Sequence, residues 1–115
     1  MNRGITMFNI IEDRGTGKTR RLMEEAYKNN GIFVCQNAYH MREKANAYGF
    51  VGLQIVSFEE FIENIRPYVK YSDVMKQGYA GPTNEPIYID ELEGLVNFIC
   101  FNRFKGYTIT KDIIK

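Results

Sequence analysis

The stretch FNIIEDRGTGKTRRLMEEA, residues 8–26, passes from an apolar run through a glycine-containing loop into charged helix formers. The run MFNII at Met7–Ile11 predicts a buried strand, and residues 18–29 have the pattern of an amphipathic helix. Gly15 and Gly17 lie between these elements, where glycine permits positive φ and removes the side chain that would block a ligand. Strand, glycine loop and helix in this order indicate an anion-binding site.

The charges of a nucleoside triphosphate explain why such a loop has this composition. Phosphates are best surrounded by backbone N–H groups, and the free N–H groups and dipole of a following helix add to the attraction. We expect Lys18 to reach the β and γ phosphates as a catalytic residue, and the Thr19 hydroxyl to bind Mg²⁺. The expected nucleotide-binding residues are Arg14, Gly15, Thr16, Gly17, Lys18, Thr19 and Arg20.

This loop resembles the Walker A loop of P-loop NTPases, whose pattern is G-x-x-x-x-G-K-[ST]. Gly17, Lys18 and Thr19 match its last three positions, whereas Glu12 stands where the first glycine would be. The core RGTGKT is also similar to the loops of AAA-type and phage-encoded ATPases, where the first position varies more. The resemblance implies ATP and Mg²⁺ as cofactors.

A carboxylate at the first loop position would oppose phosphate binding if it pointed inward. The first position begins the turn out of the strand, away from the phosphates, and accepts a residue with negative φ. We therefore expect Glu12 and Asp13 to point outward or to pair with Arg14 or Arg20.

A second motif, PIYIDE at Pro86–Glu91, resembles a Walker B strand. Its apolar residues predict a buried strand that delivers Asp90 to the carboxyl end of the sheet, where ligands bind in open α/β folds. The resemblance implies that Asp90 binds Mg²⁺ beside Thr19 and that Glu91 orients or deprotonates the attacking water. The alternative is that Asp90 and Glu91 only cap the following helix.

The remaining pattern predicts an α/β fold. Further apolar runs at Ile32–Cys35, Leu53–Ser57 and Tyr107–Thr110 predict strands. Helical periodicity marks Ala38–Tyr48, Phe58–Ile65 and Leu92–Ile99, and Ser57 with Glu60 forms a capping-box pattern before the second of these. Apolar strands separated by helices predict a three-layer sandwich with a mostly parallel five-stranded sheet, P-loop NTPase-like, in one domain over residues 1–115.

Residues 67–85 break this rhythm and predict a long loop. Its tyrosines and lysines either stack on and neutralise a single-stranded nucleic acid or fold back over the core and into solvent. The residues concerned are Tyr68, Tyr71, Tyr79, Lys70 and Lys76.

Composition sets further bounds. The formal net charge of +1 gives no reason to expect a surface that binds polyanions over the whole molecule. No apolar run is long enough for a membrane span, so we expect no membrane partner and a cytoplasmic location, in the host cell if the chain is viral. Cys35 and Cys100 lie in apolar runs and are expected as core residues, and His40 as a surface residue.

Together these features predict a slow Mg-dependent ATPase that acts with DNA or with a larger replication or packaging assembly. Self-association or a partner is expected to supply an arginine, for which Arg66 and Arg103 are candidates. The main alternative is a non-catalytic P-loop scaffold that binds a partner protein. A nucleotide kinase is less favoured because residues 67–85 contain no arginine. The residues leave the base preference, the partner and the occurrence of hydrolysis open.

Overall fold

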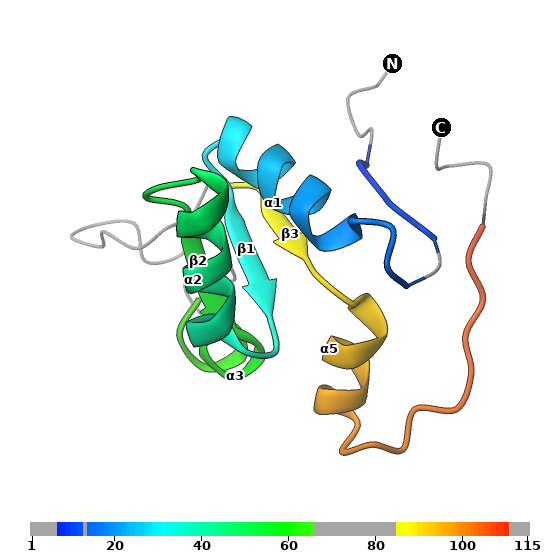
Figure 1. The fold of residues 1–115 in the computed structure, drawn as a ribbon. Coiled ribbons are helices and arrows are strands. Elements are labelled where there is room, and N and C mark those ends of the chain that lie inside the picture. Colours follow the sequence, from blue (N-terminus) through cyan, green and yellow to red (C-terminus); the bar gives the residue numbers. More distant parts are fainter. Residues whose placement is uncertain (1–6, 13, 66–84, 111–115) are drawn as a thin grey trace.

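The structure is a computed structural model that describes residues 7–12, 14–65 and 85–110. Three parallel strands form its sheet in the order β2-β1-β3 (Figure 1). They are β1 at Ile32–Cys35, β2 at Gln54–Ser57 and β3 at Ile87–Ile89. Ile32 lies opposite Gln54 in β2 and Ile87 in β3, so all three strands start at one end of the sheet and finish at the opposite end.

Helices connect and cover these strands. The helical elements are α1 at Lys18–Lys28, α2 at Ala38–Tyr48, α3 at Phe58–Glu60, η1 at Phe61–Ile65 and α5 at Leu92–Ile99. Asn37 is the N-cap of α2, and its side chain accepts a hydrogen bond from the backbone N–H of His40. Gly49 is the C-cap, with φ of 92°.

The helix that follows β2 differs in part from the expectation. The capping box is present, because the Ser57 side chain accepts from the Glu60 N–H and the Glu60 side chain accepts from the Ser57 N–H. Only α3 is α-helical, however, and residues 61–65 wind as the π-helical segment η1. The predicted helix therefore exists over the expected range with a wider second turn.

The central strand β1 is buried on both faces. Phe33 and Cys35 point to one face and pack with residues of α1 and α2, which are Met23, Ala26, Ala38 and Ala45. Ile32 and Val34 point to the other face and pack with Val56, Phe58 and Leu95. Helices therefore cover both faces of a parallel sheet, which explains why IFVC is apolar throughout.

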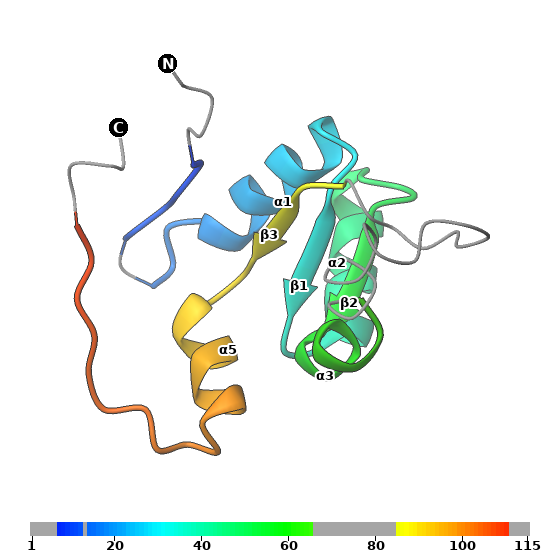
Figure 2. The same ribbon diagram turned by 180° about the vertical axis from the view of Figure 1, so that it is seen from behind.

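The prediction of five strands is wrong for the described residues. Residues 7–12 and 103–110 contain no strand, and Met7, Ile11, Tyr107 and Ile109 are exposed. In Figures 1 and 2 both segments lie on the β3 side of the sheet. An apolar run forms a strand only where a neighbouring edge supplies hydrogen bonds and a second layer covers it, and periodicity identifies neither. The α/β class is correct, with a sheet of three strands rather than five.

Several expectations fall outside the described residues. These are the conformation of Asp13, the position of Arg66, and the tyrosines and lysines of residues 67–84. Within the described ranges, no helix combines the length and apolar composition that crossing a bilayer requires.

Candidate functional site

The loop before α1 has the backbone that its glycines predict. Gly15 and Gly17 have φ of 77° and 80°, in the left-handed region that other residues enter at a cost. Gly17 is also the N-cap of α1, and open space surrounds the position of a Cβ at either glycine. Glycine has no side chain that could accept from the first N–H groups of α1, and no side-chain hydrogen bond caps this helix.

The sheet brings the second motif to this helix start. The Thr19 hydroxyl donates a hydrogen bond to Oδ1 of Asp90 over 3.1 Å, although 71 positions separate the two residues in the chain. The N–H of Asp90 donates to the carbonyl oxygen of Val34 over 2.8 Å, which holds Asp90 directly beyond the end of β3. Lys18 Nζ and Glu91 Oε2 lie 4.0 Å apart beside this contact. The four residues therefore form one cluster where β3 ends and α1 begins.

Asp90 is a buried carboxyl group. Asp90 is 8% exposed, and among the residues that the structure describes it is the one charged residue that is buried. Burial raises the pKa of Asp90, and the nearby Glu91 carboxylate acts in the same direction, whereas the Thr19 hydrogen bond and the Lys18 charge lower it. The site thus keeps the Asp90 carboxyl group away from water, with the Thr19 hydroxyl bonded to it and the charges of Lys18 and Lys44 within electrostatic range.

Glu91 adopts an unusual backbone conformation. It has φ of 60° as the N-cap of α5, and no side-chain hydrogen bond caps that helix. A non-glycine residue in this region carries strain of about 1 kcal/mol. The capping alternative for the Asp-Glu pair therefore lacks its hydrogen bond, and the Glu91 side chain instead extends toward Lys18 with 65% exposure.

Glu12 pairs with a residue other than those predicted. Its carboxylate accepts hydrogen bonds from both terminal nitrogens of Arg21, one of them at 3.2 Å between Nη1 and Oε2. Arg21 Nη2 also donates to the carbonyl oxygen of Thr16 over 3.2 Å. The Arg21 hydrogen bond lowers the pKa of Glu12, and the contact with Thr16 and the charge of Lys18 contribute. Glu12 is therefore exposed, as one of the two expectations had it, but its partner is Arg21 rather than Arg14 or Arg20.

The other arginines have different surroundings. The guanidinium carbon of Arg20 lies 4.7 Å from the ring centroid of Tyr48, which draws this side chain toward α2. Arg14 is exposed in the loop. Arg103 is exposed and lies beyond the end of α5.

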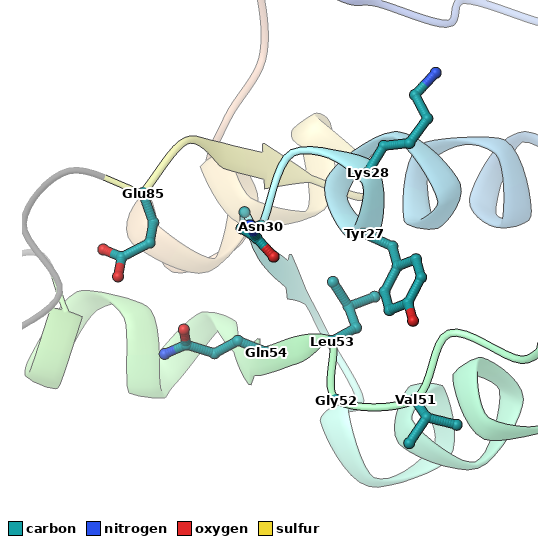
Figure 3. A pocket seen from close by; sticks show the side chains of 9 residues that line it. Tyr27, Lys28, Asn30, Val51, Gly52, Leu53, Gln54 and Glu85 are labelled. Carbon is teal, nitrogen blue, oxygen red and sulfur yellow. The ribbon is translucent and has the colours of Figure 1, made fainter.

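A pocket of about 620 Å³ lies at the opposite end of the sheet, where β1 and β2 begin (Figure 3). The end of α1, the turn into β1, the loop before β2 and Glu85 contribute to its wall. The lining residues are Tyr27, Lys28, Asn30, Gly31, Val51, Gly52, Leu53, Gln54 and Glu85. This pocket is separate from the cluster around Asp90, because the strands run from one edge to the other.

Arg21, in the first turns of α1, is the residue near the loop that the sequence analysis missed. It lies one helical turn after Gly17, and its backbone N–H donates to the Gly17 carbonyl oxygen over 3.1 Å. Side chains of a helix tilt toward its N-terminus, so a long side chain at this position reaches back over the preceding loop. That tilt is the signal that identifies Arg21 from sequence.

Comparison of the chain with family models, with curated proteins and with solved structures found no match. The site is therefore described by its own geometry: a glycine loop, a helix start, a lysine, a hydroxyl and two carboxylates.

Proposed function

We propose that the chain is a P-loop NTPase-like protein that binds Mg·ATP between the start of α1 and the end of β3. One observation carries the proposal, namely the 3.1 Å hydrogen bond from Thr19 to Asp90. These two residues belong to motifs that resemble Walker A and Walker B, and the resemblance requires them to meet. A strand that ended elsewhere would have separated them.

Phosphate recognition is assigned to the loop and to Lys18. The positive φ of Gly15 and Gly17 turns the backbone, and open space beside both glycines leaves room for an anion to approach. Lys18 is half-buried and adds a positive charge at the helix start, where the helix dipole also favours negative groups. Together these groups favour a polyphosphate over a neutral ligand.

Magnesium binding is assigned to Asp90 and Thr19. Within the described ranges, no three His, Cys, Asp or Glu side chains gather into a metal-binding group. Mg²⁺ commonly uses one or two carboxylates and completes its shell with water and substrate phosphates, so a buried carboxylate beside a hydroxyl fits it. Bound there, the ion would neutralise phosphate charge, while Asp90 and Thr19 orient it.

Hydrolysis is assigned to Glu91 and Lys18. Glu91 is exposed and close to Lys18, which suits a carboxylate that orients or deprotonates a water molecule, and Lys18 stabilises charge on the phosphates. Slow turnover is part of the proposal, since an arginine supplied by self-association or by a partner normally contributes much of the rate. DNA or a replication or packaging assembly is the partner class that the resemblance implies.

A non-catalytic scaffold is the second candidate, and one observation favours it. The Thr19 hydroxyl bonds to Asp90, and Lys18 lies near Glu91, so the polar groups of the site compensate one another. These contacts join the two motifs through protein groups alone, as a scaffold requires. The scaffold hypothesis predicts that loss of nucleotide binding leaves the interaction with the partner protein unchanged.

Calorimetry and thermal unfolding with ATP, with and without Mg²⁺, test the main proposal. An ATP concentration of 100 times Kd should raise the free energy of unfolding by about 2.7 kcal/mol. Lys18→Ala should abolish this gain, whereas Lys28→Ala, which removes the same charge at the far end of α1, should retain it. Absence of binding by the wild-type protein would refute the proposal, and equal binding by Lys18→Ala would refute the assigned site.

A further inference from the structure

Glu12 occupies the loop position where the resemblance expects glycine, and its side chain takes part in the contacts that hold the loop. The carboxylate is engaged by both terminal nitrogens of Arg21. A planar guanidinium matches a carboxylate in this two-point geometry better than any other side chain does. The beginning of the loop is therefore attached to the first turns of α1.

The same guanidinium also holds the middle of the loop. Arg21 Nη2 donates to the carbonyl oxygen of Thr16, and the Arg21 backbone N–H donates to that of Gly17. In a trans peptide the C=O and the following N–H point in opposite directions. Because the Thr16 carbonyl is directed at Arg21, the N–H of Gly17 points away from Arg21. A ligand on that side of the loop therefore meets the N–H group and not the partially negative carbonyl oxygen.

Charge gives the pair a second effect. The Lys18 charge lowers the pKa of Glu12, which indicates that the Glu12 carboxylate is within electrostatic range of the lysine assigned to phosphate. Arg21 compensates that carboxylate. Without Arg21, Glu12 would compete with phosphate for Lys18 and would repel the incoming anion.

We propose that Glu12 and Arg21 form a clasp that holds the loop in its phosphate-receiving shape, with Arg21 as a positioning residue for nucleotide binding. This inference rests on the proposed function of the site. The clasp replaces the conformational role of the missing first glycine with an ion pair that reaches across the loop.

Binding of Mg·ATP to the full chain, measured by calorimetry, tests the clasp. Arg21→Ala should raise Kd by about tenfold, because a charged hydrogen-bonded group is lost and a competing carboxylate is released. Glu12→Ala in the Arg21→Ala background should recover part of this affinity, since the competing charge is then absent. Arg21→Lys should recover less than the full affinity, because lysine keeps the charge and lacks the fork geometry.

Lys28→Ala is the matched control, because it removes one positive charge from the same helix at a distance from the loop. Circular dichroism verifies the fold of each variant, and amide exchange of residues 15–18 without nucleotide reports loop shape alone. Faster exchange in Arg21→Ala together with weaker binding supports the clasp. If the wild-type protein binds ATP and Arg21→Ala binds equally well, the clasp is refuted and the proposed function stands. If the wild-type protein does not bind ATP, both are refuted.

Discussion

Replacing Thr19 by valine removes the hydroxyl that Asp90 accepts from, while keeping nearly the same volume. The lost bond is part-buried and its acceptor is 8% exposed. A hydrogen bond to a charged group contributes about 1.5–3 kcal/mol when well buried, so we expect this part-buried one to contribute about 1–2 kcal/mol. The corresponding fall in melting temperature is roughly 5–10 °C.

The loss should depend on pH in a defined direction. Burial raises the pKa of Asp90 in the folded protein, so its charged form is the unfavourable one. Stability from this group is therefore highest below the ordinary aspartate pKa and is lost as pH rises through the raised value. Because the Thr19 hydrogen bond opposes that rise, Thr19→Val should be most destabilising at neutral pH and nearly harmless once Asp90 is protonated.

Urea unfolding followed by circular dichroism, from neutral pH down to the acid limit of the fold, measures this difference. Thr108→Val is the control, since it makes the same chemical change at an exposed position. The reasoning fails if Thr19→Val matches wild type at neutral pH, or if its destabilisation is the same at every pH. The first result would mean that no bond links the two motifs, and the second that Asp90 is not the group it serves.

Three further predictions concern a close contact at a glycine, a helix cap and a buried thiol. Gly31→Ala should reduce the free energy of unfolding by about 1–3 kcal/mol in urea titrations, because the added Cβ would lie 2.6 Å from the Tyr88 ring; unchanged stability would contradict the packing of β3. Ser57→Ala should cost about 1 kcal/mol in the same assay through loss of the capping box, and an effect near zero would contradict that cap. Burial raises the pKa of Cys35 to about 12, so alkylation at pH 8 should modify it only after denaturation, as peptide mass spectrometry would show; labelling of the folded protein at the rate of Cys100 would contradict its burial.

Local signals predicted the elements whose causes lie within a few residues. The helix Ala38–Tyr48 has both ends specified by its own sequence, with Asn37 as N-cap and Gly49 as C-cap. Likewise, the run IFVC is apolar throughout, and this pattern predicts the burial on both faces that β1 shows. One distant contact was also expected from the pattern: Asp90 follows a strand at the carboxyl end of a parallel sheet, where ligands bind, and Thr19 lies in the first turn of the helix after the glycine loop.

Features that depend on distant partners were not predictable in the same way. The run Met7–Ile11 has the composition of a strand, but its pairing requires an edge whose position no local pattern gives. Arg21 was not predicted as the partner of Glu12, because the sequence places Arg14, Arg20 and Arg21 all near the loop. The direction of side chains on α1 selects Arg21, whereas Arg20 lies over the Tyr48 ring.

The bond between Thr19 and Asp90 also determines when the site can come into being during synthesis. A ribosome adds roughly 5–20 residues per second, so the 71 positions between the two take roughly 4–14 seconds to make. During that interval the emerging chain carries its glycine loop and Lys18 but lacks Asp90 and Glu91. Under the proposed function, a nucleotide met in that interval would find the loop and Lys18 but not Asp90 or Glu91, which are added later.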